Sequence, residues 1–349
     1  MSKAQPGILI YHLSDLHFGP YLEGVSGEGE WSSFFAPHSF LLLQGMEIAL
    51  EFWNVIKNDK DRLMVAVTGD LTTTAEPPAY HNANNYLRDH PFVSTKLQVG
   101  LRLQEITDRI FFVPGNHDIW FYGNWFTRWK RFSDRRKLYM KYFGETIPNV
   151  YPLLINGISV TVFTIDTNRV EKFNFINFKN VLGKGEVGKA QIADIQTLHL
   201  NLLHDTSIDV PSGYDYPSSL KIALMHHHLS VPKDVPRDTQ ESILELKDTD
   251  PVLNLLSEIG VQLVLCGHQH FPYHIPNLRS SKYSNKPILL SCAGSATQMG
   301  NEKNSFSKYE IIKKESEYVL RLRVYESNYK SGDYFFKNTV DTTLNLGSQ

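Results

Sequence analysis

The stretch FFVPGNHDIW, from Phe111 to Trp120, leaves an apolar run and places proline, glycine, asparagine, histidine and aspartate in direct succession. Short apolar runs bounded by turn residues are typical of buried strands. The stretch therefore predicts a strand that ends in a polar loop, which is either a simple turn or the rim of a site. The choice depends on whether other strands end in matching chemistry.

Similar apolar runs recur along the chain and predict further buried strands that end in polar or small residues. Together the predicted strand segments are Gly7–Asp15, Arg62–Asp70, Arg109–Asp118, Ile158–Asn168, Ser219–His228, Val261–His270 and Lys286–Ser295. Amphipathic segments predict helices at Ser39–Asn58, Thr127–Phe143, Gly188–Asp205 and Asp250–Gly260. Strand–helix alternation of this kind predicts an α/β fold.

The C-terminal part has a different pattern. Ser307–Ser327 alternates about a turn-like centre, which predicts a hairpin added to a sheet, and roughly the last ten residues are expected to fray. Since no internal repeat or low-complexity linker is found, we predict a single domain over residues 1–349, with its core at about 7–300 and the hairpin and tail at 301–349. Gly19–His38 and Glu76–Gln98 have no clear role in a core and are expected to be functional loops that determine specificity.

The composition is that of a globular protein with a sizeable core. The 349 residues are 42% hydrophobic and 21% charged, and the formal net charge of −2 argues against binding of polyanions through bulk charge. The two cysteines, Cys266 and Cys292, favour a reducing compartment and buried thiols, although a disulfide between them stays open. There is no apolar signal segment at the start and no apolar run of about 18 residues, so we expect a cytoplasmic protein without a membrane span.

Oxygen and imidazole donors follow five of the predicted strands directly. In chain order they are Asp15 and His17; Asp70; Asn116, His117 and Asp118; His226, His227 and His228; and His268 and His270. Each signal is weak alone, because an isolated Asp-x-His is commonly a turn and a lone buried histidine is commonly a core residue. The carboxyl ends of strands in α/β sheets, however, converge on one ligand-binding edge. The ordered set therefore predicts a metal site at that edge.

The blocks SDLHFG, TGDLT, VPGNHDI and GHQH closely resemble those of the calcineurin-like metallophosphoesterases, and the resemblance extends from about Ile8 to Ser295. Within that family, the chain looks most similar to the cyclic-nucleotide phosphodiesterase-like branch. The resemblance implies a four-layer α/β/β/α sandwich of two mixed sheets flanked by helices. It also implies a hydrolase that cleaves a phosphodiester, with a small nucleotide-like or cyclic-nucleotide ester as substrate.

The resemblance further implies a site for two divalent metal ions that hold a hydroxide for in-line attack on phosphorus. The first ion would take Asp15, His17, Asp70 and His270, and the second Asp70, Asn116, His226 and His268. Asp70 would bridge the two ions. Oxygen and imidazole donors suit Mn, Fe, Zn or Co.

The resemblance places His117 over the substrate as a general acid for the leaving group, and Asp118 would hold its ring in orientation. The alternative, capping of a helix start, explains Asp118 but not the histidine. Within the triple histidine, the family pattern places the ligand at His226 and leaves His227 to contact substrate. His227 stays open as the ligand, because here HHHLSVP delays the next proline to Pro232.

Three other functions remain open at this point. A nuclease of the same superfamily would favour a basic groove or a DNA-binding module, and neither the net charge nor the residues after Ser295 favour binding of nucleic acid. A phosphomonoesterase or protein phosphatase would use the same donors. A non-enzymatic scaffold is disfavoured because every expected ligand is present.

Overall fold

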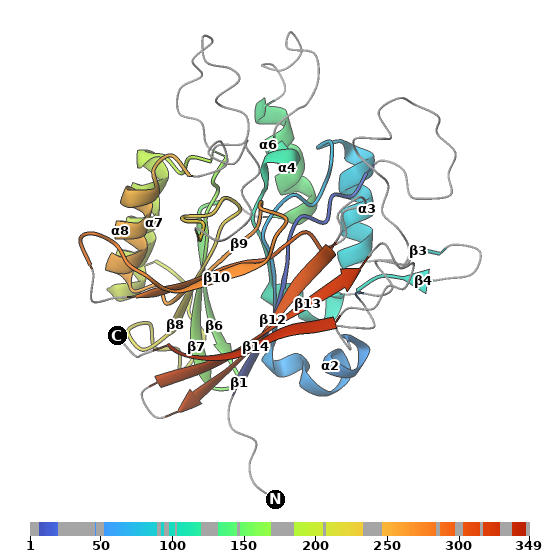
Figure 1. Ribbon diagram of the computed structural model, residues 1–349. Helices are drawn as coiled ribbons and strands as arrows, with labels where there is room; N and C mark the ends of the chain where they lie inside the picture. Colours follow the sequence, from blue (N-terminus) through green and yellow to red (C-terminus); the bar gives the residue numbers. More distant parts are fainter. Residues whose placement is uncertain are drawn as a thin grey trace, which may run out of the picture.

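Two mixed six-stranded sheets form the centre of the molecule, with helices on their outer sides (Figure 1). In this computed structural model the described residues are 7–19, 46, 52–88, 92–93, 98–101, 103–119, 132–144, 147–168, 185–204, 207–232, 246–283, 287–296, 303–314, 317–328 and 337–346. None of the helices in these ranges is long and apolar enough to cross a membrane.

The first sheet has the order β14-β13-β12-β1-β2-β5. Its strands are β1 (Gly7–Leu13), β2 (Leu63–Val67), β5 (Ile110–Phe112), β12 (Lys303–Lys314), β13 (Glu317–Asn328) and β14 (Lys337–Leu346). β1, β2 and β5 run parallel, whereas β12 pairs antiparallel with β1 and β13. The predicted C-terminal hairpin is confirmed. The predicted fraying is wrong for residues 340–346, because β13 pairs with β14 in an antiparallel ladder with one irregularity at Val324 and Tyr325.

The second sheet has the order β10-β11-β9-β8-β7-β6. Its strands are β6 (Asn149–Ile155), β7 (Ile158–Thr164), β8 (Leu220–Leu224), β9 (Leu263–Cys266), β10 (Tyr273–Leu278) and β11 (Ile288–Cys292). The four inner strands are parallel, and the two edge strands β6 and β10, which the sequence did not predict, are antiparallel. β7, β8 and β9 are buried along their whole length, as expected for parallel strands covered on both faces.

Helices cover the outer face of each sheet (Figure 1). They are α2 (Phe52–Asp59), α3 (Pro77–Leu87) and α6 (Phe132–Phe143) beside the first sheet, and α7 (Lys189–Leu203) and α8 (Thr249–Ile259) beside the second. α8 ends at Gly260 with a φ of 82°, the left-handed C-cap that glycine favours. Of the two expected loops, residues 20–38 lie outside the described ranges, and Glu76–Gln98 contains α3.

Three hydrophobic layers hold these elements together. Ile10 and Ile222 belong to the layer between the sheets, Phe306 to the layer under α3 and α6, and Leu256 to the layer under α8. Helices, two sheets and helices thus form the expected four-layer arrangement. The cysteines of β9 and β11 are both buried free thiols.

We predict that β13 is an essential part of the core. Leu320 is fully buried in the layer between the sheets, so Leu320→Ala should lower the free energy of unfolding by about 2–5 kcal/mol. Leu200, 49% exposed on α7, provides the matched control, and Leu200→Ala should cost less than about 0.5 kcal/mol. Urea unfolding measures both, and equal losses would contradict the assigned layer.

Candidate metal centre

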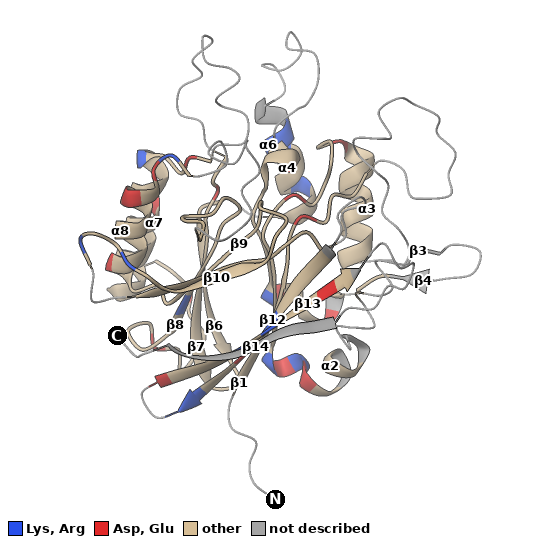
Figure 2. Ribbon diagram, viewed as in Figure 1, with Lys and Arg blue, Asp and Glu red and all other residues tan. Residues whose placement is uncertain are grey.

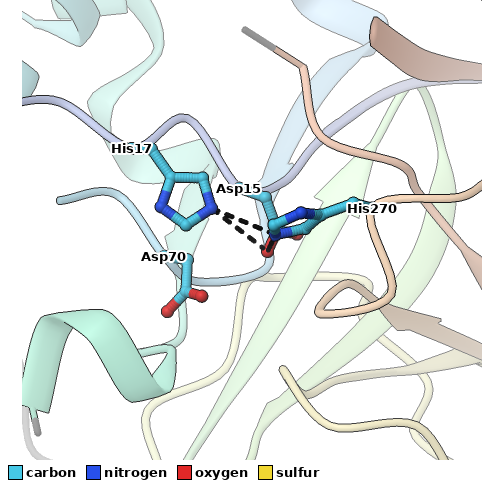
Figure 3. Close-up of side chains that lie close together, drawn as sticks. All are labelled: Asp15, His17, Asp70 and His270. Carbon is cyan, nitrogen blue, oxygen red and sulfur yellow. Dashed lines mark hydrogen bonds and ion pairs between the residues drawn. The ribbon is translucent and has the colours of Figure 1, made fainter. Parts of the chain in front are cut away.

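The loops after β1, β2, β8 and β9 bring six of the predicted donors together in two clusters. The first contains Asp15, His17, Asp70 and His270 (Figure 3), and the second contains Asp70, His226 and His268. Within each cluster, the potential ligand atoms all lie within 4.8 Å of one another. Asp70 belongs to both.

In the first cluster, three side chains point toward one another (Figure 3). His270 Nε2 lies 3.1 Å from His17 Nε2 and 3.2 Å from Asp15 Oδ1. Two ligands that each lie about 2.1 Å from one ion are themselves roughly 3 Å apart. The observed spacings are therefore those of donors around a shared cation.

In the second cluster, His226 Nε2 is the central atom. It lies 3.0 Å from Asn116 Oδ1, 3.1 Å from His268 Nδ1 and 3.4 Å from Asp70 Oδ2. On the other side of the ring, Nδ1 donates a hydrogen bond of 2.7 Å to the carbonyl of Thr68. This bond fixes the tautomer that leaves Nε2 for a ligand.

The other two histidines of the triplet lie elsewhere. His227 Nδ1 is 2.7 Å from Thr167 Oγ1, and its ring centre lies 4.4 Å from that of His268. His227 is fully buried, and a contact of this residue with substrate stays a prediction. His228 is also buried, with Nε2 3.4 Å from Gln269 Nε2. Of the three rings, only that of His226 belongs to a cluster.

The backbone at the clustered residues adopts an uncommon conformation. Positive φ angles occur at Asp15, His17, Asp70, His268 and His270. For residues other than glycine, such angles cost of order 1–3 kcal/mol each and persist only where the surroundings over-determine them. The fold thus concentrates backbone strain at the residues predicted to bind metal.

Glycines allow the loops to approach the clustered side chains closely. A Cβ on Gly115 would lie 2.1 Å from Asp70 Oδ1, and one on Gly69 would lie 2.5 Å from His226 Nδ1. A Cβ on Gly267 would lie 1.8 Å from Ser14 Oγ. Such contacts are too short for any larger residue, so these positions require glycine.

The charges of the buried side chains in the clusters favour the binding of positive charge. Burial raises the pKa of the Asp70 carboxyl, but the charges of the neighbouring His226 and His117 rings lower it by more. The resulting pKa of Asp70 lies well below its usual value. Burial likewise lowers the pKa of His226, but the Asp70 charge outweighs it and raises that pKa to about 10. Buried ionised carboxylates among imidazoles fit divalent cations, which supply the charge that protons otherwise supply.

His117 lies beside the clusters without being part of either. Its backbone N–H donates to Asp70 Oδ1 at 2.8 Å, and its ring lies 4.9 Å from the His17 ring, edge to face. The ring Nδ1 donates to the carbonyl of Thr73 at 3.2 Å, and Nε2 lies 4.0 Å from Asp70 Oδ2.

The side chain of Asp118 is held by hydrogen bonds from two segments of the chain. Its carboxylate accepts hydrogen bonds from the Leu71, Thr72 and Gly115 backbone amides and from the Thr72 hydroxyl. The His117 ring Nδ1 donates to the carbonyl of Thr73, which follows β2. A role of Asp118 in holding that ring stays a prediction.

Two supporting residues were not predicted from the sequence. Ser14 Oγ donates to Asp15 Oδ2 at 2.5 Å, and Ser295 Oγ donates to the Asp15 carbonyl at 2.7 Å. The position of Ser14, directly before the first predicted ligand, is the signal that could have indicated it. Ser295 is distant in sequence and left no such signal.

A model of the calcineurin-like phosphoesterase family matches residues 8–272, more than half of the sequence. The chain belongs to the calcineurin-like phosphoesterase family. This is a family of dinuclear metal-dependent enzymes, and the two clusters give the phosphoesterase candidate ligands for both ions.

Solved structures share its fold. A purple acid phosphatase from yellow lupin (Lupinus luteus) seeds is 12% identical at a TM-score of 0.51, and the match covers 99% of this chain and 54% of the lupin chain. The phosphoesterase thus spans about half of the lupin protein's length.

Two weaker likenesses have lower TM-scores. A predicted phosphoesterase from Streptococcus pneumoniae is 10% identical at a TM-score of 0.35, with 98% of this chain and 99% of that chain covered. Chaetomium thermophilum Vps29, complexed with a cyclic peptide, is 9% identical at a TM-score of 0.36, with 98% of each chain covered. No curated protein matches the sequence.

We predict that Mn²⁺ stabilises the phosphoesterase. A cation that binds only the folded state at 100 times its Kd adds about 2.7 kcal/mol to the free energy of unfolding, so the melting temperature should rise on addition of Mn²⁺ and fall on chelation. Asp70→Asn removes the shared carboxylate and should abolish most of the rise. Asp194→Asn, on the exposed side of α7, should leave it intact. If the melting temperature of the wild type does not change on addition of Mn²⁺, a cation site here is ruled out.

Proposed function

We propose that this phosphoesterase hydrolyses a phosphodiester, with a small nucleotide-like or cyclic-nucleotide ester as its substrate. The observation that carries the proposal is the sharing of Asp70 by two donor clusters, with His117 beside both. The similarity of its motifs to the cyclic-nucleotide phosphodiesterase-like branch supports a diester.

We assign the ligands by cluster. Asp15, His17 and His270 would hold one ion, Asn116, His226 and His268 the other, and Asp70 both, which the spacings within the clusters support. Divalent cations bound there would neutralise the charge of the phosphate and lower the pKa of water. Asn116 contributes an oxygen without adding negative charge, which favours an anionic substrate.

His117 serves as the general acid in this proposal. A carbonyl oxygen can only accept, so the bond to Thr73 requires the proton on Nδ1 and directs Nε2 toward the clusters. The His117 side chain is 19% exposed, whereas that of Asp70 is 1% exposed. A partly open ring beside buried ligands can reach a substrate.

The reaction then balances simply. A water oxygen forms a bond to phosphorus and releases a proton to solvent, while the bond from phosphorus to the leaving oxygen breaks on the opposite side. In this step His117 acts as the imidazolium, with protons on both Nδ1 and Nε2. The leaving oxygen takes the Nε2 proton, so that an alcohol departs and a neutral ring protonated at Nδ1 remains, which solvent then reprotonates.

The charge distribution favours a small substrate over a nucleic acid. Lys and Arg residues are interspersed with Asp and Glu residues over the described elements (Figure 2). On α6, Arg135 is buried and Arg136 pairs with Asp166. Arg135 therefore lies inside the fold, and the charge of the partly exposed Arg136 is already paired. Cytoplasmic location is part of the proposal, supported by the two buried free thiols.

We predict that His117→Gln affects esters according to their leaving group. With Mn²⁺, hydrolysis of a cyclic nucleotide, which releases an alkoxide, should lose about 10²–10⁴-fold in kcat. Hydrolysis of bis(p-nitrophenyl) phosphate should lose less, because p-nitrophenolate leaves without a proton. Steady-state kinetics on both esters and metal analysis of each variant measure this.

His204→Gln, an exposed histidine at the end of α7, provides the control and should match the wild type. Equal losses on both esters, or none with Mn²⁺ still bound, would refute the role of His117. Comparison with p-nitrophenyl phosphate separates diesterase from monoesterase activity. A panel of cyclic nucleotides, dinucleotides and phospholipid head-group esters then identifies the substrate class.

A further inference from the structure

Asp118 is a fully buried carboxylate whose oxygens each accept two hydrogen bonds. Oδ1 accepts from the Thr72 N–H at 2.8 Å and from Thr72 Oγ1 at 3.0 Å. Oδ2 accepts from the Gly115 N–H at 3.0 Å and from the Leu71 N–H at 3.2 Å. Three of these four bonds reach the loop after β2, which carries Asp70.

The tie between the two loops is reciprocal. Asp118, which follows β5, accepts hydrogen bonds from backbone amides in the loop after β2. In return, Asp70 in the loop after β2 accepts a hydrogen bond from the backbone amide of His117. Gly115 lies so close that a Cβ there would be 2.1 Å from Asp70 Oδ1. Asp70, Thr72, Gly115, His117 and Asp118 form what we call the loop clasp.

The loop clasp acts where the backbone needs restraint. Asp70 has a φ of 49° and follows Gly69 with a φ of 92°. The amides that Asp118 binds belong to Leu71 and Thr72, the next two residues along the chain. Strained conformations persist only under such local restraint. The same loop continues to Thr73, whose carbonyl orients the His117 ring.

Two simpler roles do not account for these contacts. Capping of the short helix α4 (Asn116–Ile119) explains the bond from Gly115 but not the three from Leu71 and Thr72. Proton transfer to a substrate requires access, and the carboxylate is 0% exposed with both oxygens occupied.

We propose that Asp118, together with the Thr72 hydroxyl, is a positioning residue that sets Asp70 between the two clusters and sets the direction of the His117 ring. The proposal rests on the function proposed above for those two groups. It assigns to Asp118 an effect on both metal affinity and turnover, without contact to substrate.

The test uses Asp118→Asn in the full chain. The amide has the same size but turns one acceptor into a donor, so two of the four bonds are lost. Loss of an outer hydrogen-bond partner typically costs 10–100-fold in metal affinity or activity. We expect Mn²⁺ affinity, titrated without substrate by electron paramagnetic resonance, to fall 10–100-fold. At saturating Mn²⁺, kcat should stay at least tenfold reduced while KM changes little.

Thr72 gives a graded series. Thr72→Val removes the hydroxyl and should lower Mn²⁺ affinity and kcat in the same direction as Asp118→Asn, by a smaller factor. Thr72→Ser keeps the hydroxyl and should therefore have Mn²⁺ affinity and kcat close to those of the wild type. A role in packing alone would be rescued by Val, which has the shape of Thr, and not by Ser.

Asp248→Asn is the matched control for loss of stability. The Asp248 carboxylate accepts hydrogen bonds from the backbone amides of Val187 and Gly188, directly before α7. These bonds are of the same kind as those of Asp118 but lie away from both clusters. The Asp248→Asn substitution should lower the melting temperature and leave Mn²⁺ affinity and kcat near their wild-type values.

The outcomes separate the two proposals. Unchanged Mn²⁺ affinity and kcat in folded Asp118→Asn would overturn the positioning role, whatever the melting temperature. If the wild type binds Mn²⁺ but hydrolyses no ester, the proposed function fails, and the Mn²⁺ titrations still decide the role of Asp118.

Discussion

A carboxylate removed from water organises this protein. Asp70 lies at the junction of the two clusters, 1% exposed, with an amide on one oxygen and a histidine near the other. An uncompensated buried charge costs several kcal/mol, so the surroundings must supply positive charge. Imidazoles from both sheets, and the cations that they fit, meet that need. The glycines at 69 and 115 and the left-handed turn follow from bringing loops this close.

The strain at this junction is offset by the layers beneath it. Parallel strands buried on both faces hold the loop bases rigidly, and apolar burial contributes roughly 25 cal/mol for each Å² removed from water. A site on such bases can keep several residues in costly conformations at once. The supporting bonds from Ser14 and Ser295 to Asp15 show the same arrangement on the first cluster.

The sequence predicted which residues meet because strand ends are readable and share an edge. The donors after β1, β2, β8 and β9 do gather there, and Asn116 after β5 reaches His226. Edge strands were harder: β6 contains Pro152 and is only half buried, so it lacks a clear apolar run. β14 reads KNTVDTTLNL, a polar stretch whose strand state comes from its pairing with β13.

Three details of the site could not be predicted from the sequence: which histidine belongs to the cluster, the partners of Asp118, and the positive φ angles. Adjacent imidazoles at His226 and His227 look alike, and only the direction in which β8 ends assigns one to the cluster. The partners of Asp118 lie 46 and 47 positions away, and no local pattern reports such a contact. Positive φ at aspartate or histidine has no sequence signature either, because these residues, although enriched there relative to other non-glycine residues, adopt it at only a small fraction of positions.

The placement of β1 has a consequence for how the protein is made. This first strand lies inside its sheet, and Gly7 pairs with Ile312 of β12. During synthesis, one side of β1 therefore stays open until β12 has left the ribosome. Contacts so distant in sequence form slowly, and an open strand edge invites association with other chains. The nascent chain is thus exposed to such association at β1 until β12 covers this edge.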